Sequence, residues 1–229
     1  MDDGAADTAE SLEMLRASAR QGIALVAATP HFYPREESVE KFLRRRAESL
    51  SRLESARQQA PDGADLPPVL PGAEVLLREG LSRQDMRPMC IGGTNYLLVE
   101  PPFREPPVWL AEELEGLVFG QHLRLIWAHV DRYLEWYSAA DWAELLELPD
   151  VIPQLNADVF GAPRALRAVC KRLPTVPYMA LGSDMHGAVR RPTRMELAAH
   201  GLTRGAAGYR AAAVAAFEDE FIKTLGNGR

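Results

Sequence analysis

Three histidines and three carboxylates in this chain each stand where a short apolar segment ends. They are His31, Glu74, Glu100, His129, Asp184 and His186, the last of which follows Asp184 by two residues. Imidazole and carboxylate groups together suit borderline first-row ions such as Mn²⁺, Fe²⁺ or Zn²⁺, whereas all-oxygen sites suit Mg²⁺ or Ca²⁺. The residue types and their placement therefore predict a centre that holds more than one metal ion.

Such a centre is suited to hydrolysis of phosphate esters. Two or three ions about 3.5–4 Å apart can bind both the attacking and the leaving oxygen, and they lower the pKa of a bound water. Glu100 could bridge two ions, which a single imidazole cannot do. We expect Asp184 and His186 to lie on one side of an extended segment, because side chains alternate with a period of two.

Each of these residues also has a simpler interpretation. A histidine after an apolar segment is more often a hydrogen-bonding residue than a ligand. Glu74 or Glu100 alone could be a loop carboxylate or a helix cap. It is the joint placement that favours a metal site. His122 and His200 follow no predicted strand, so we expect them to be surface or core histidines.

Two arginines stand close to this set in the sequence. Arg132 comes three residues after His129, and Arg191 comes five residues after His186. A guanidinium can bind phosphate oxygens through two hydrogen bonds. From spacing alone, a surface ion pair explains either arginine equally well. The run Arg44-Arg45-Arg46 is interpreted as the solvated face of a helix, with docking of an acidic partner as the lesser alternative.

The apolar segments themselves are typical of buried parallel strands, because they alternate with helical patterns. Strands are predicted at residues 23–28, 69–73, 96–99, 123–128, 151–156 and 178–183. Helices are predicted at residues 7–22, 36–59, 82–86, 108–118, 139–148, 163–173 and 206–225. Parallel strands with right-handed crossovers bring their carboxyl ends to one edge, where chemistry gathers. The prediction is one α/β domain over residues 1–229, most simply a parallel barrel.

Composition limits the partners and the chemistry. The net charge of −6 argues against a nucleic-acid partner, and no apolar stretch approaches the length that crosses a bilayer. The N-terminus lacks a secretory apolar segment, which favours the cytoplasm. Cys90 and Cys170 lie far apart, which suggests a reducing compartment. Neither is followed by arginine at the sixth position, so the cysteine-nucleophile phosphatase loop is absent.

Taken in order, several short segments resemble those of the PHP-type metallophosphatases, and most closely the bacterial capsule-biosynthesis tyrosine phosphatases of the CpsB/CapC/YwqE family. These segments are Asp2-Asp3-Gly4, Thr29-Pro30-His31, Gly72-Ala73-Glu74, Leu98-Val99-Glu100, Ala128-His129 with Arg132-Tyr133, Gln154-Leu155-Asn156, and Ser183-Asp184-Met185-His186 with Arg191-Pro192. Each segment alone is a weak signal. The ordered set is specific and spans nearly the whole chain.

The resemblance implies a distorted parallel (β/α) barrel of the PHP type with two or three metal ions, usually manganese, with iron or zinc as alternatives. By matching segments, the ligands would be Asp3, His31, Glu74, Glu100, His129, Asp184 and His186. Arg132 and Arg191 would bind the substrate phosphate. The implied substrate is phosphotyrosine on the tail of a cognate bacterial tyrosine kinase that controls exopolysaccharide export.

The chain departs from the family at its start. The family opens with a strand that carries Asp-x-His-x-His, whereas here Met1 directly precedes Asp2-Asp3-Gly4. Two alternatives follow: either the chain lacks that strand and its two histidines, and with them part of one metal site and the partner of one barrel edge, or its true start lies upstream. Two other functions stay open. One is a phosphatase of small phosphomonoesters such as histidinol phosphate, and the other is a non-catalytic member that binds a kinase or phosphopeptide.

Overall fold

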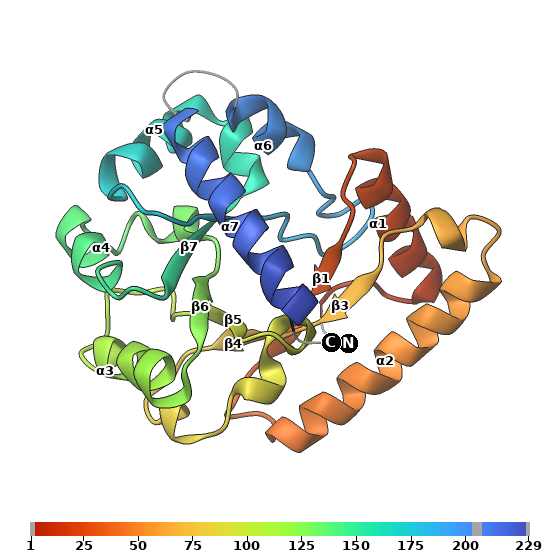
Figure 1. Ribbon diagram of the computed structural model, residues 1–229, viewed down its shortest axis with the longest axis horizontal. Coiled ribbons are helices and arrows are strands. Elements are labelled where there is room, and N and C mark those ends of the chain that lie inside the picture. Colours follow the sequence, from red (N-terminus) through yellow and green to blue (C-terminus); the bar gives the residue numbers. More distant parts are fainter. Residues whose placement is uncertain (1–2, 203–207, 228–229) are drawn as a thin grey trace.

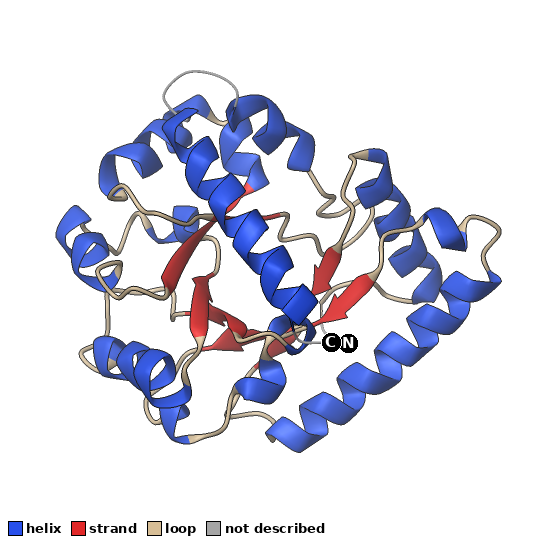
Figure 2. Ribbon diagram, viewed as in Figure 1, coloured by secondary structure: helices blue, strands red, loops and turns tan. Residues whose placement is uncertain are grey.

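Short parallel strands surrounded by helices make up the molecule (Figures 1 and 2). The structure is a computed structural model that describes residues 3–202 and 208–227. The strands are β1 (Val26–Ala28), β2 (His31–Phe32), β3 (Val69–Pro71), β4 (Glu74–Leu76), β5 (Tyr96–Glu100), β6 (Arg124–Trp127), β7 (Val151–Asn156) and β8 (Ala180–Gly182). Each of the six segments predicted as a strand contains at least one of them.

All of the strand pairs are parallel, as predicted. The larger sheet has the order β2-β4-β5-β6-β7-β8, and β1 pairs with β3. Within residues 3–202 and 208–227 no hydrogen-bonded ladder joins β8 to β1 or β2. The edge strands of the larger sheet are therefore β2 and β8. The parallel α/β class is therefore confirmed, and closure into a barrel stays a prediction.

Each of the first two predicted strands is followed by a further short strand, β2 or β4, that was not predicted. Proline at position 30 has no N–H to donate, and the ladder is interrupted between β1 and β2. The Pro30 carbonyl instead accepts a hydrogen bond from the Glu74 amide at 3.0 Å. His31 and Glu74 therefore begin β2 and β4 and pair in register, instead of following the end of a strand.

The helices are α1 (Thr8–Arg20), α2 (Val39–Gln59), α3 (Leu110–Glu115), α4 (Ala139–Leu145), α5 (Pro163–Arg172), α6 (Met195–Leu202) and α7 (Gly208–Asn227). Local sequence explains where several of them begin. Asp7 caps α1 by accepting a hydrogen bond from the Glu10 amide, as predicted, and Ser38 caps α2 in the same way. Ser138 and Asp141 form a reciprocal capping box at α4.

Two helix predictions need correction, and one helix was not predicted. Residues 82–86 form no helix beyond the 3-10 turn Leu81–Arg83, because the Glu113 carboxylate binds the amides of Gly80 and Ser82 and fixes this loop. The helix predicted at 108–118 begins only at Leu110 and ends in a π-helical turn, Gly116–Gly120. Helix α6 was not predicted. The predicted start of the last helix, residues 206–207, lies outside the described residues.

The sheet separates two hydrophobic clusters, because side chains alternate between its faces. Leu97 and Val99 of β5 belong to the larger cluster, which also contains side chains from α2, α3 and α4. Tyr96 and Leu98 belong to the smaller cluster on the other face. We call this second side the inner face. Helix α7 lies across it, and Figure 1 shows α7 crossing in front of the strands.

The arginine run in α2 differs from the expectation of a solvated face. Arg44 is exposed, and Arg45 forms an ion pair with Glu37. Arg46, however, is partly buried and donates hydrogen bonds to the carbonyls of Gly72 and Pro88, each at 2.9 Å. Burial lowers its pKa. Arg46 therefore ties α2 to the segment that leads into β4.

In the portion of the chain that the structure describes, no helix combines the length and the apolar character needed to cross a membrane.

Candidate metal centre

The alternation of side chains along the strands places three of the predicted ligands on the inner face. Tyr96 and Leu98 face inward, so Glu100, two residues further along β5, faces inward as well. Glu74 of β4 pairs with Leu98, and His31 of β2 pairs with Glu74. The three side chains are close enough for one atom of each to lie within 4.8 Å of the others.

His129 completes a buried cluster with the two glutamates. It is the second residue after β6 and has a positive φ of 32°, which turns the chain sharply there. Its Nε2 lies 3.0 Å from Glu74 Oε1 and 3.4 Å from Glu100 Oε1. Burial favours the neutral imidazole, but the hydrogen bonds to Glu100 and Glu74 outweigh it and raise the pKa of His129 to about 9. The two glutamates therefore favour the protonated form of His129.

A second group of ligand atoms overlaps the first through His31. Nε2 of His186 lies 3.4 Å from Asp3 Oδ1, and Nε2 of His31 lies 3.8 Å from the same oxygen. One atom each of Asp3, His31 and His186 again falls within 4.8 Å of the others. Asp3 is the open member of this group, with 59% of its side chain exposed. The predicted ligands thus lie together: Glu100 ends β5, and His129, Asp184 and His186 follow strands, whereas His31 and Glu74 begin β2 and β4.

Asp184 and His186 come together by a route that differs from the prediction. The segment is not extended at Asp184, where φ is +46°, and β8 has already ended at Gly182. The turn places the Asp184 carbonyl 2.9 Å from His186 Nδ1. Nδ1 also lies 3.2 Å from Arg191 Nη1, so both of these contacts use Nδ1, and Nε2, the atom nearest Asp3, is the potential ligand.

Both predicted arginines reach the same carboxylate. Arg191 Nη2 lies 2.9 Å from Asp184 Oδ2, and Arg132 Nη1 lies 3.4 Å from that same oxygen. Their side chains are 40% and 39% exposed, so each retains donors that face solvent. The guanidinium carbon of Arg132 lies 4.7 Å from the centre of the Phe103 ring, a cation–π contact that holds its position. Two guanidinium groups therefore converge beside the histidine and carboxylate cluster.

Three polar residues that were not predicted as site residues take part in hydrogen bonds that hold the backbone next to the cluster. The Gln154 side chain accepts a hydrogen bond from the His129 amide at 3.2 Å. The Asp131 carboxylate accepts one from the Asn156 amide at 2.8 Å, and burial raises the pKa of Asp131. Gln154 and Asn156 follow one another on alternate positions of β7, the last predicted strand before β8. That placement was the available signal for them.

The arrangement fits metal ions. Two atoms that each lie about 2.1 Å from one ion are at most about 4.2 Å apart. The ligand atoms of each group lie within 4.8 Å of one another, so they need only small movements to bind one ion together. The four carboxylates and three imidazoles in the set are the mixed donors that first-row ions accept. Neither Cys90 nor Cys170 belongs to the clustered donors, and His122 and His200 are exposed, as predicted.

The parallel α/β sheet and the cluster of histidines and carboxylates place this protein in a broad class. It is the class of α/β proteins whose binding site is formed by strand ends and the loops that follow them. Comparison with known proteins narrows the class. The family model CpsB/CapC, described as capsular polysaccharide synthesis, matches residues 1–216. This chain belongs to the CpsB/CapC family.

Two relatives agree with this assignment. Tyrosine-protein phosphatase YwqE of Bacillus subtilis (strain 168) is 34% identical over 144 residues, which are 59% of this chain and 52% of YwqE. The chain thus matches about half the length of that relative. A solved structure from work on YwqE of Bacillus subtilis and CpsB of Streptococcus pneumoniae, described as unique metal-dependent tyrosine phosphatases, has a TM-score of 0.76. It is 21% identical, covers 99% of this chain and 90% of its own, and shows the shared fold.

Proposed function

We propose that this protein is a metal-dependent phosphatase that hydrolyses phosphotyrosine in a protein substrate. The observation that carries the proposal is the convergence of Arg132 and Arg191 on Asp184, next to the buried cluster of His129 and Glu100. Cationic donors for a phosphate and anionic ligands for metal ions are thereby adjacent. We assign the seven clustered histidines and carboxylates as ligands and the two arginines as phosphate-binding residues.

The proposed function assigns different roles to the metal ligands, the two arginines and the residues that support them. Bound divalent ions would supply Lewis-acid stabilisation of phosphate charge and a more acidic water. Arg132 and Arg191 would donate hydrogen bonds to the non-bridging phosphate oxygens, where charge accumulates in the transition state. Phe103 holds Arg132 in place from one side, and Gln154 fixes the backbone of His129 from behind. Preorganised donors of this kind lower the barrier without a protein nucleophile.

The choice of metal and of partner is part of the proposal. Histidine and carboxylate donors without thiolates suit manganese, with iron or zinc as alternatives. Membership of a capsular polysaccharide synthesis family and similarity to a tyrosine-protein phosphatase support a phosphotyrosyl protein as substrate. We extend this to the phosphorylated tail of a bacterial tyrosine kinase that regulates exopolysaccharide synthesis.

The first experiment measures phosphate release from a phosphotyrosyl peptide by the 229-residue chain. We expect turnover in the presence of Mn²⁺, loss of turnover on treatment with a chelator, and recovery when Mn²⁺ is restored. A parallel assay with histidinol phosphate and other small phosphomonoesters addresses the rival substrate class. Hydrolysis confined to small esters, or peptide binding with no phosphate release, would contradict the proposal.

A further inference from the structure

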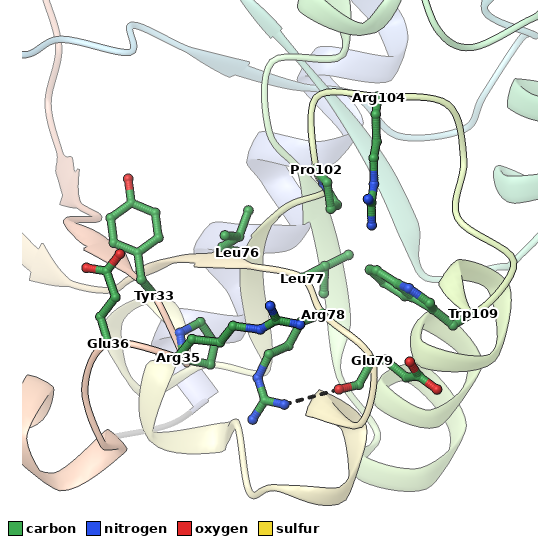
Figure 3. A pocket seen from close by; sticks show the side chains of 11 residues that line it. Tyr33, Arg35, Glu36, Leu76, Leu77, Arg78, Glu79, Pro102, Arg104 and Trp109 are labelled. Carbon is green, nitrogen blue, oxygen red and sulfur yellow. Dashed lines mark hydrogen bonds between the residues drawn. The ribbon is translucent and has the colours of Figure 1, made fainter.

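A cavity of about 280 Å³ lies beside the metal centre (Figure 3). Three of its lining residues each follow a predicted ligand by two positions. The pairs are His31 and Tyr33, Glu74 and Leu76, and Glu100 and Pro102. Two residues of extended chain span about 7 Å. The cavity therefore lies close to the predicted ligands, and the Tyr33 ring stacks on the His31 ring with a centroid distance of 5.5 Å.

Three arginines from three separate segments line this cavity. They are Arg35, Arg78 and Arg104. Figure 3 shows Arg104 reaching down from the loop after β5 toward Trp109, while Arg35 extends from the opposite side beneath Leu76. Arg78 gives one hydrogen bond to the Glu79 carbonyl at 3.1 Å, but its Nε is buried and has no hydrogen-bond partner among the described residues.

These three arginines differ from the arginines of this chain that have a carboxylate partner. The net charge is −6, and many other arginines are paired with carboxylates. The paired ones include Arg16, Arg45, Arg57, Arg87 and Arg124. Within the described residues, Arg35, Arg78 and Arg104 form no ion pair. Guanidinium groups gathered without counterions favour an anionic ligand.

The remaining lining residues indicate what kind of anion would fit. Glu36 and Glu79 also line the cavity, but both are exposed, and Figure 3 shows the Glu36 carboxylate beside Tyr33, on the side away from Arg104. Leu76, Leu77, Pro102 and Trp109 supply apolar walls. A carboxylate carried on a short methylene stem matches both features, because the stem packs on the walls while the charged end meets the arginines.

We propose that this cavity is a subsite for an acidic side chain, glutamate or aspartate, that flanks the phosphotyrosine of a peptide substrate. The inference rests on the proposed function, because it places the phosphotyrosine at the metal centre. It adds a preference for sequence around the phosphorylated residue, which the metal ligands and Arg132 cannot provide by themselves.

The test uses the full chain loaded with Mn²⁺ and a set of otherwise neutral phosphotyrosyl peptides. A single glutamate is moved through the flanking positions and compared with glutamine at each. We measure kcat/KM, and separately Kd for the same peptides carrying a non-hydrolysable phosphonate. We expect about five- to tenfold preference for glutamate at one or two positions, as charge-assisted hydrogen bonds would give, and a decline of the preference with salt.

Variants connect the preference to the cavity. Arg104→Gln and Arg78→Gln should each reduce the ratio of glutamate to glutamine below about twofold, by the loss of a charge-assisted bond. Arg52→Gln, which removes an exposed arginine from α2, should leave the ratio unchanged. Circular dichroism and metal content confirm that the variants are folded and loaded.

The outcomes separate this inference from the proposed function. Hydrolysis of all peptides with equal rates for glutamate and glutamine would uphold the phosphatase and overturn the subsite. A preference that survives in both Arg104→Gln and Arg78→Gln would also overturn it. If no peptide is hydrolysed, the proposed function fails. The phosphonate Kd ratio then decides the subsite alone, since an anionic pocket binds whether or not turnover follows.

Discussion

At the scale of single residues, Asp184 is where the proposed metal ligands and the proposed phosphate-binding arginines meet. Its Oδ2 contacts Arg132 and Arg191, its carbonyl faces His186 Nδ1, and Asn156 approaches the same carboxylate at 3.5 Å. It is also one of the described non-glycine residues with positive φ, together with His129 and His122. Aspartate and histidine are among the residue types that most often adopt a positive φ, so the sequence tolerates these sharp turns at two of the predicted ligands.

The assignment of Arg132 predicts a specific kinetic defect. Arg132→Ala should lower kcat on a phosphotyrosyl peptide by about 10²- to 10³-fold, the usual cost of a lost donor to developing oxyanion charge. The number of metal ions per chain, measured by elemental analysis, should stay the same because Arg132 is not a ligand. Arg164→Ala, an exposed arginine of α5, serves as the control. Full activity in Arg132→Ala would show that the arginine is only a surface ion pair.

The residues that cluster at the candidate site could be predicted from the sequence, but the residues that support them could not. His31, Glu74 and Glu100 stand beside apolar segments, and strand periodicity carries that signal directly. The roles of Gln154 and Asp131 depend on which strand lies next to which, because each binds a backbone amide of another segment. That information lies in the order of the strands in the sheet, which cannot be derived from a single sequence.

At the scale of elements, helix α2 is fastened to the sheet near its amino end. Phe42 is its buried side chain, and the ring meets Phe32 of β2 edge-on at 5.2 Å. Arg46, one turn later, lies over the Phe42 ring and binds two carbonyls of the chain that flank β4. Since Phe32 follows His31, this contact helps to position a predicted ligand.

Removal of the Phe42 ring should therefore destabilise the protein strongly. Phe42→Ala should lower the free energy of unfolding by about 3–5 kcal/mol, as expected for a fully buried phenylalanine, measured by chemical denaturation. Because that loss is a large part of typical total stability, Phe42→Leu provides a milder variant that should fold and lose less. Arg44→Ala, an exposed position of the same helix, is the matched control. An unfolding midpoint in Phe42→Ala equal to that of the control would show that α2 is not anchored here.

Sequence patterns located the long elements better than the short ones. The starts of α1 and α4 carry capping side chains and agree with prediction. The turn Leu81–Arg83 does not become a helix because a distant carboxylate, Glu113, fixes its amides. Helix α6 packs closely on the turn Ala157–Gly161, a contact between segments far apart in sequence. Tertiary contacts of this kind are invisible to local propensity.

At the scale of the whole molecule, one end of the inner face carries the candidate metal site and the other end packs against α7. Glu100 and His129, two of the predicted ligands, lie where β5 and β6 end, whereas α7 packs near Tyr96 and Arg124, where these strands begin. Phe217 and Phe221 of α7 meet the Tyr96 ring edge-on at 5.7 Å and 5.1 Å. The last helix therefore contributes to the hydrophobic core at the end of the sheet opposite the metal centre.

This division predicts that stability and catalysis can be separated by substitution in α7. Phe221→Ala should lower the free energy of unfolding by about 2 kcal/mol, less than for a fully buried ring because Phe221 is only partly covered. Thermal or denaturant unfolding measures the loss, and Ile222→Ala, whose side chain is 56% exposed, is the neighbouring control that should lose little. The metal content and peptide turnover of folded Phe221→Ala at 25 °C should equal those of the unchanged chain, because the substitution lies at the far end of the inner face. A loss of bound metal with unchanged stability would instead mean that α7 acts on the centre itself.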